Sequence, residues 1–139
     1  MHFDRFSIAL LVLRPDAPEL SDEDAAALQD AHMAHLADLH DSGLLLAAGP
    51  LLGGADSAFR GLSILNVDPE RARRLKEQDP AVRAGRFSVL VLPWMVPGGA
   101  MSFSATHFPR SAAETQDAGT QDAGTQDAGT QDTGTQDAT

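Results

Sequence analysis

The last 25 residues of the chain are five copies of a five-residue unit, and they limit the folded part to what precedes them. The unit, Thr-Gln-Asp-Ala-Gly with small changes in the last two copies, begins at Thr115. A solenoid of such units needs a large apolar side chain in each repeat, but the only apolar side chain here is alanine. So little apolar surface cannot offset the entropy cost of ordering these residues. We therefore predict one folded domain, residues 1–110, and a disordered low-complexity tail, residues 111–139. The tail is either an acidic solubilising spacer or a repeat expansion without a selected role, and we favour the second.

The acidic composition excludes some classes of partner. Twenty Asp and Glu stand against ten Lys and Arg, a formal net charge of −10, and phosphate backbones repel such a chain, so we expect no nucleic acid partner. The first long apolar run, residues 8–13, is far shorter than the roughly 20 residues of a membrane span. Asp4 stands where a signal peptide would be basic. We therefore expect a cytoplasmic protein with no membrane partner.

The chain contains no Cys, no Tyr and a single lysine, Lys76. Without Cys there is no disulfide framework, thiolate nucleophile or cysteine-based metal site. Lys76 stands among Arg71, Arg73 and Arg74, a pattern that predicts a solvated helix face and not the dry pocket that a Schiff-base amine needs. We therefore expect no pyridoxal chemistry, which leaves His and carboxylate side chains as the main catalysts.

Alternating apolar residues and helix-capping signals predict six elements. The expected strands are residues 6–13, 44–48, 59–67 and 86–94, and the expected helices are residues 22–41 and 69–78. Ser21 with Asp24 resembles a capping box, and Asp68 with Pro69 places an N-cap before a helix-starting proline. Gly43 is expected to end the first helix.

The order of these elements, β-α-β-β-α-β, predicts an α+β domain of the ferredoxin-like class. In that fold two helices cover one face of a four-stranded antiparallel sheet. Several strands carry apolar residues at both phases of the alternation, for example Leu10 with Leu11 and Leu90 with Val91. The second face of the sheet therefore also needs a cover, and a face-to-face homodimer is the simplest one.

Three of the five His lie in the first predicted helix, at His32, His35 and His40. At about 100° per residue, His32 and His35 share the face that leucines claim for the core, and His40 points away from its centre. Such histidines can be structural, can bind a metal or can transfer protons. Zinc prefers three or four ligands, and the chain has neither Cys nor an HExxH motif, so we expect no metal site. An imidazole suits proton transfer near neutral pH, provided that a carboxylate orients its other nitrogen.

Asp79, which follows the second predicted helix in Gln78-Asp79-Pro80, is a candidate for that carboxylate. It has an equally good structural explanation, because aspartate caps short turns whose first residue is proline. The spacing alone leaves both interpretations open.

Several short motifs occur in a fixed order along residues 6–96. They are His32-Met33-Ala34-His35-Leu36, His40-Asp41-x-Gly43, Ala48-Gly49-Pro50, Asp79-Pro80-x-x-x-Ala84-Gly85 and Leu92-Pro93-Trp94. Together they resemble the YCII family of small bacterial proteins. The resemblance implies a ferredoxin-like fold that pairs as a dimeric α+β barrel, with a shared pocket that holds a His and an Asp, matching His32 and Asp79. It also implies cofactor-independent chemistry, and the activity best associated with the family is elimination of chloride from a chlorinated hydroxyquinol.

Two segments depart from the family pattern. Where relatives often open the third strand with Gly-Ser, this chain has Gly61-Leu62-Ser63, which makes Ser63 the candidate for the family hydroxyl. Residues 97–110 extend beyond the minimal domain and are candidates for a lid over the pocket or for a dimer contact.

These features lead to a mechanistic hypothesis. Asp79 accepts a hydrogen bond from one nitrogen of His32, and the other nitrogen moves a proton on a small cyclic or aromatic molecule in a lyase- or isomerase-type reaction. His35 is the reserve base. Further candidates for contact with the substrate are Arg14, Ser63, Trp94 and Phe87. Core packing is the stronger explanation for the two aromatic residues. The alternative is that the same fold binds a small ligand, or serves as an accessory or scaffold protein, without turning anything over.

Overall fold

The computed structural model describes residues 1–54 and 56–116. Its elements, in chain order, are β1 (Phe3–Leu13), α1 (Asp22–Asp41), β2 (Leu45–Pro50), β3 (Phe59–Leu65), α2 (Pro69–Glu77), α3 (Pro80–Arg83) and β4 (Phe87–Pro97). The predicted order of strands and helices is confirmed. The short helix α3 is the turn that the capping interpretation of Asp79 requires.

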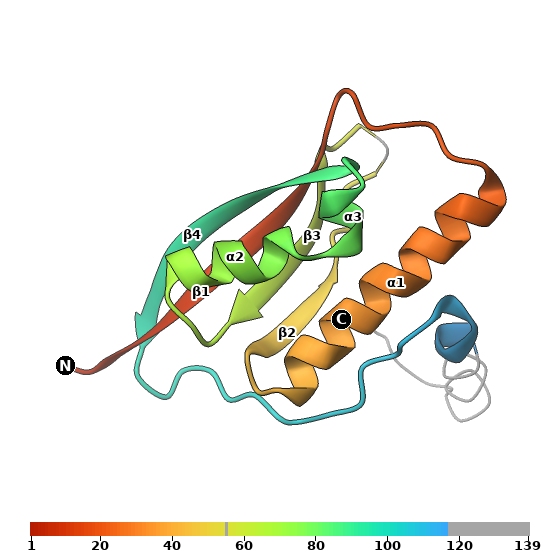
Figure 1. The fold of residues 1–139 in the computed structure, drawn as a ribbon. Helices are drawn as coiled ribbons and strands as arrows, with labels where there is room; N and C mark the ends of the chain where they lie inside the picture. Colours follow the sequence, from red (N-terminus) through yellow and green to blue (C-terminus); the bar gives the residue numbers. More distant parts are fainter. Residues whose placement is uncertain (55, 117–139) are drawn as a thin grey trace.

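The four strands form one antiparallel sheet in the order β2-β3-β1-β4. This is the ferredoxin-like arrangement, in which β1 and β3 are the central strands although α1 and β2 separate them in the sequence. The helices lie together on one face of the sheet (Figure 1). The predicted fold class is therefore confirmed.

Local signals explain where the helices begin and end. Ser21 accepts a hydrogen bond from the backbone N–H of Asp24 at 3.1 Å, and Asp68 accepts one from the backbone N–H of Arg71 at 2.8 Å. Both predicted N-caps are thus present. Gly43 has a φ of +80°, a left-handed conformation that glycine adopts without strain and that ends α1.

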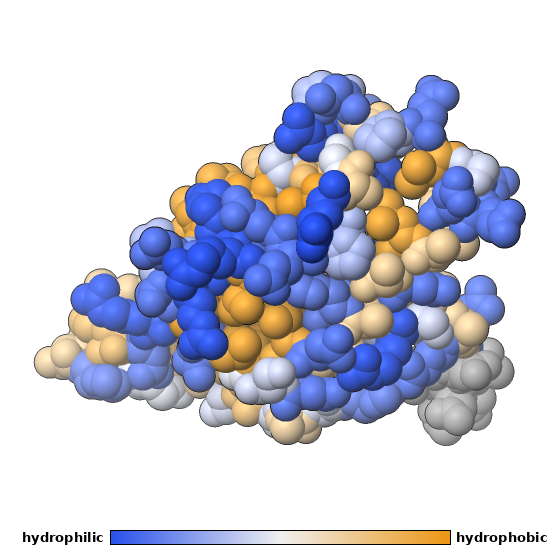
Figure 2. Space-filling view, in the orientation of Figure 1, coloured by the Kyte–Doolittle hydropathy of each residue, from blue (hydrophilic) through white to orange (hydrophobic). Residues whose placement is uncertain are grey.

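The hydrophobic core lies between the helices and the sheet. Its buried members are Ala9, Leu39, Leu45, Leu65, Ala72 and Val91. The surface above the helices is mostly hydrophilic, with hydrophobic patches between them (Figure 2).

Because Val91 faces the core, its neighbours Leu90 and Leu92 face the other side of the sheet, where they are 40% and 44% exposed. The sheet therefore has a second apolar face, as the two-phase alternation predicted.

The segment that follows β4 runs back to the side of α1 (Figure 1). Residues 112–116 are helical, and the backbone N–H of Ala112 donates a hydrogen bond to Asp30 of α1 at 2.9 Å. The disorder predicted from residue 111 is therefore wrong for these first residues, because contacts with α1 supply the partner surface that the repeat itself lacks. The rest of the predicted tail, residues 117–139, lies outside the described residues.

Candidate active site

His32 and Asp79 meet although 47 positions separate them in the sequence. His32 lies in α1, and Asp79 lies between α2 and α3. Nδ1 of His32 and Oδ2 of Asp79 are 2.7 Å apart, the Asp79 side chain is fully buried, and the His32 side chain is 13% exposed. The pair therefore forms a short hydrogen bond that is shielded from water, while part of the imidazole remains accessible.

The two carboxylate oxygens of Asp79 have different partners. Oδ1 caps α3 by accepting the backbone N–H of Ala81 at 2.9 Å, and Oδ2 faces His32. The structure thus contains both contacts that the sequence left as alternatives. Burial raises the pKa of the Asp79 carboxyl, but the hydrogen bonds from His32 and Ala81 and the nearby Lys76 outweigh burial and hold the pKa below its usual value. An ionised Asp79 only accepts hydrogen bonds, so Nδ1 of His32 donates, and in the neutral ring the lone pair is then on Nε2.

Lys76 does not lie where the sequence predicted. Its side chain is fully buried, on the same face of α2 as the buried Ala72 four residues earlier. Nζ of Lys76 donates a hydrogen bond to Oγ of Ser63 at 3.2 Å, and Oδ2 of Asp79 lies 3.9 Å away. Burial lowers the pKa of Lys76, an effect that the Asp79 carboxylate partly opposes. The prediction of a solvated lysine is therefore wrong, because the helical position of Lys76, and not the charge of its sequence neighbours, decides its environment.

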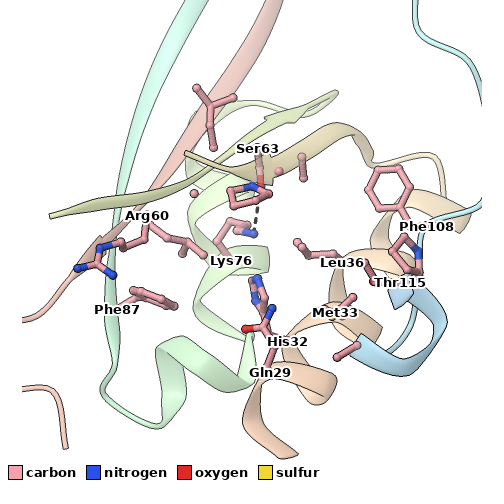
Figure 3. Close-up of a pocket in the computed structure, with 18 of the residues that line it drawn as sticks. Gln29, His32, Met33, Leu36, Arg60, Ser63, Lys76, Phe87, Phe108 and Thr115 are labelled. Atoms are coloured by element: carbon pink, nitrogen blue, oxygen red, sulfur yellow. Dashed lines mark hydrogen bonds between the residues drawn. The ribbon is translucent and has the colours of Figure 1, made fainter. Parts of the chain in front are cut away.

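A cavity of about 590 Å³ lies beside these residues, in the size range of small-molecule sites. His32 from α1, Lys76 from α2 and Ser63 from β3 lie close together at its edge (Figure 3). Much of the remaining lining is apolar: Leu11, Met33, Leu36, Phe87 and Phe108. Such a cavity suits a small and mainly apolar molecule that carries a few polar groups.

The structure brings only some of the predicted site residues to the cavity. Ser63 and Phe87 line it. Arg14 is exposed and forms an ion pair with a neighbouring aspartate. Trp94 packs against Phe6, with ring centroids 6.3 Å apart, on the face of the sheet that points away from the helices. Arg14 and Trp94 are therefore not among the cavity lining.

His35, the reserve base, connects two helices instead of lining the cavity. Its Nε2–H donates a hydrogen bond to the backbone carbonyl of Leu75 at 3.2 Å, which ties α1 to α2. Burial lowers the pKa of His35, because a partly desolvated ring resists protonation. These contacts favour a structural role for this histidine.

We expect His35 to make stability depend on pH. Its pKa in the folded state is lowered, so below the ordinary value of about 6.5 the unfolded chain binds a proton that the folded chain does not. The free energy of unfolding should therefore decrease as the pH falls from about 6.5 towards the lowered pKa. A His35→Gln variant should have a flatter profile in urea unfolding between about pH 5 and 8. Parallel profiles for the two proteins would contradict this expectation.

The C-terminal segment forms one wall of the cavity. Phe108, which lines the cavity, stacks on His40 with ring centroids 4.0 Å apart. His40 donates Nδ1–H to a backbone carbonyl of β2 at 2.7 Å, and its Nε2 accepts the backbone N–H of Thr106 at 3.0 Å. Arg110 forms ion pairs with two aspartates of α1, both at 2.9 Å. The segment thus borders the cavity and is held to α1 and β2, and its role as a lid or as a dimer contact stays a prediction.

Replacing His40 with Phe should release this segment. The variant keeps a ring for stacking but loses both hydrogen bonds, and such losses at a buried group cost about 1–3 kcal/mol. Because Arg110 is the trypsin site within the segment, we expect cleavage after Arg110 to become about tenfold faster, measured by mass spectrometry of the fragments. A His2→Phe variant is the matched control, since His2 is 79% exposed. Equal cleavage rates in the two variants would contradict the anchoring role of His40.

Several residues of the cavity lining were not predicted as site residues, among them Gln29, Met33, Lys76 and Phe108. The sequence does carry a signal for Gln29 and Met33, which lie three residues before and one residue after His32 on the same helical stripe. The signal for Lys76 is its place four residues after Ala72 on the inner face of α2. Phe108 has no such signal, because its segment follows the last strand and has no periodic pattern.

Within residues 1–54 and 56–116, no three His, Cys, Asp or Glu side chains are grouped closely enough to hold a metal ion. No helix in the described part of the chain is long and apolar enough to cross a membrane.

The chain is similar to a known protein family and to several solved structures. A family model described as the YCII-related domain matches residues 9–95. One similar solved structure is that of 5-chloro-2-hydroxyhydroquinone dehydrochlorinase from Burkholderia phenoliruptrix in complex with 2,5-dihydroxybenzoquinone. The two proteins are 24% identical in sequence, and the match covers 64% of this chain and 92% of that chain with a TM-score of 0.46. A dimeric protein of unknown function and ferredoxin-like fold from Bacteroides fragilis is 14% identical, with a TM-score of 0.45 over 68% of this chain and 100% of that chain. A protein from Arabidopsis thaliana is 13% identical, with a TM-score of 0.37 over 70% of this chain and 100% of that chain. No curated protein matches the sequence.

Proposed function

The chain belongs to the family of YCII-related domains, and we propose that it is a small enzyme that transfers a proton to or from a small cyclic or aromatic organic molecule without a cofactor. The reaction is an elimination or an isomerisation. One observation carries the proposal: the buried carboxylate of Asp79 lies 2.7 Å from Nδ1 of His32, beside a cavity of about 590 Å³ that His32 lines.

The proposed mechanism uses His32 as a general base. The Asp79 carboxylate accepts Nδ1–H and thereby fixes the tautomer in which Nε2 carries a lone pair. Nε2 removes a proton from a carbon atom of the bound molecule, and the Asp79 carboxylate stabilises the imidazolium that results. A positioned base of this kind contributes roughly 10²–10⁴ in rate. That contribution suits a C–H bond already acidified by a neighbouring carbonyl group.

The cavity supports a ring compound as the substrate. Two phenylalanines and several aliphatic side chains line it, so apolar surface of the ligand would be buried there. The polar groups of Lys76 and Ser63 lie near His32, and they would orient the carbonyl end of the ligand towards the base (Figure 3). The chemistry of this substrate is therefore that of a small cyclic ketone, a quinone or a hydroxyaromatic compound.

Proton exchange in D2O tests this function. Wild-type protein is incubated with a panel of cyclic ketones and chlorinated hydroxyaromatics, and ¹H NMR follows the signals of protons next to the carbonyl while chloride release is measured in parallel. We expect at least one compound to react faster with the protein by about 10² or more. Saturable binding without exchange or elimination would contradict the enzymatic proposal and support the ligand-binding alternative.

We propose in addition that the chain forms a homodimer through the face of the sheet opposite the helices. This face carries Leu90 and Leu92, which are 40% and 44% exposed, and a second copy of the same face would bury them. Sedimentation should give a dimer for the wild type and a monomer for a Leu92→Asp variant. Leu52→Asp is the control, because Leu52 is 93% exposed in the loop between β2 and β3. A monomeric wild type would contradict this proposal.

A further inference from the structure

Lys76 has more hydrogen-bond donors than the protein satisfies. An ammonium group carries three protons, and within residues 1–54 and 56–116 its one hydrogen-bond acceptor is Oγ of Ser63 at 3.2 Å. Oδ2 of Asp79, at 3.9 Å, is beyond hydrogen-bond distance and already accepts Nδ1–H of His32. Lys76 is buried within the protein and borders the cavity, so an acceptor that the protein does not supply has to come from the cavity side. A buried cation with unused donors indicates that a ligand supplies an acceptor.

The amine is placed to meet a ligand in the cavity. Lys76, Ser63 and His32 come from three different elements, and all three line the same cavity. Figure 3 shows the Lys76 amine between Ser63 and the imidazole of His32. A ligand atom that accepts a hydrogen bond from Lys76 therefore lies close to the proposed base.

We propose that Lys76 and Ser63 form a binding position for an oxyanion, so that the cavity selects molecules that carry or develop an enolate or phenolate oxygen beside His32. This inference rests on the function proposed above and names its substrate class. When Nε2 of His32 takes the proton from carbon, the electron pair of the broken C–H bond moves to form a C=C bond, and the carbonyl oxygen becomes the oxyanion. The Lys76 ammonium and the Ser63 hydroxyl then donate hydrogen bonds to that oxygen.

The charges of the four groups balance throughout this step. Before it, the Asp79 carboxylate is matched by the Lys76 ammonium, and His32 and the ligand are neutral. After it, the imidazolium of His32 and the oxyanion add one charge of each sign. Opposite charges that develop together in a site shielded from water stabilise each other more strongly than they would in water. Lys76 thereby has a role at the site other than that of a Schiff-base nucleophile.

Binding of 4-nitrophenol tests the oxyanion position directly, because its phenolate absorbs visible light and forms near neutral pH. Wild-type protein should bind the phenolate about tenfold more tightly than the phenol, which lowers the apparent pKa of the bound probe by about one unit. 4-Nitroanisole, which has the same ring but cannot ionise, measures binding to the rest of the cavity. Absence of saturable phenolate binding, or equal affinities for phenol and phenolate, would overturn the inference.

Variants separate the two proposals. Lys76→Met keeps the length of the side chain without the charge, and it should abolish the preference for phenolate while it retains binding of 4-nitroanisole. Ser63→Ala should weaken that preference in the same direction. His32→Gln should lower the rate of proton exchange by about 10²–10⁴ and leave the preference for phenolate in place. Unchanged phenolate preference in Lys76→Met would therefore overturn the oxyanion position alone, whereas exchange at the wild-type rate in His32→Gln would overturn the base alone.

A measurement on the unsubstituted protein does not depend on the folding of any variant. Lys76 is the only lysine, so ¹⁵N-lysine labelling gives a single side-chain NMR signal. At pH 7 this signal should be that of an ammonium group, and it should shift when 4-nitrophenolate is added but not when 4-nitroanisole is added. A neutral amine, or an ammonium signal that 4-nitrophenolate leaves unchanged, would overturn the inference.

Discussion

Replacing Asp79 with alanine is expected to lower the free energy of unfolding by about 3–5 kcal/mol. The substitution leaves the buried Lys76 without its counter-ion, which lies 3.9 Å away in the native site. It also removes the partner of His32 and the N-cap of α3. The loss should appear as a lower midpoint in urea unfolding, with an unchanged dependence on denaturant concentration.

A double-mutant cycle shows how much of this loss comes from the stranded lysine. In a Lys76→Met background the Asp79→Ala change should cost clearly less, because no buried cation is left unpaired. Asp16→Ala is the surface control, since Asp16 is 71% exposed. Equal costs of Asp79→Ala in the two backgrounds would mean that Lys76 is uncharged or stabilised by another group.

The second large effect is expected on rate and not on stability. On the best compound of the exchange panel, His32→Gln should lower the rate by about 10²–10⁴, because glutamine has no basic nitrogen to accept the proton. His35→Gln is the matched control: it is the same substitution on the same helix, one turn away and outside the cavity lining. The control should keep a rate within a few-fold of the wild type. Similar losses in both variants would indicate that the helix, and not the base, had been disturbed.

Much of the fold could be predicted because its signals are local. The N-caps Ser21 and Asp68 and the helix end at Gly43 depend on contacts within a few residues, and each lies where the sequence placed it. Strand alternation predicted a sheet with two apolar faces for the same reason. The helical residues 112–116 were not predictable in this way, because they are held by Asp30, which is distant in sequence.

The candidate site was predictable only in part, because it is assembled from separate elements. The resemblance to a family paired His32 with Asp79, whereas the spacing of the residues alone left Asp79 as either a cap or a partner. The Asp79 carboxylate has two oxygens and makes both contacts. The prediction for Lys76 was wrong because three arginines in the same stretch indicated a solvent-exposed helix face. The partners of Lys76 are Ser63, 13 positions away in the sequence, and Asp79, three positions away just past the end of α2, and the charge pattern of the stretch indicates neither contact.

The claim that His32 and Asp79 act as one unit is tested most directly by the exchange rate of an Asp79→Asn variant, alone and combined with His32→Gln. Asparagine keeps an oxygen for the α3 cap but removes the charge that fixes the tautomer of His32. We predict that Asp79→Asn loses about 10² or more in rate and that the double variant is no slower than His32→Gln alone, as for residues that act together. A folded Asp79→Asn variant that exchanges protons at the wild-type rate would contradict the claim.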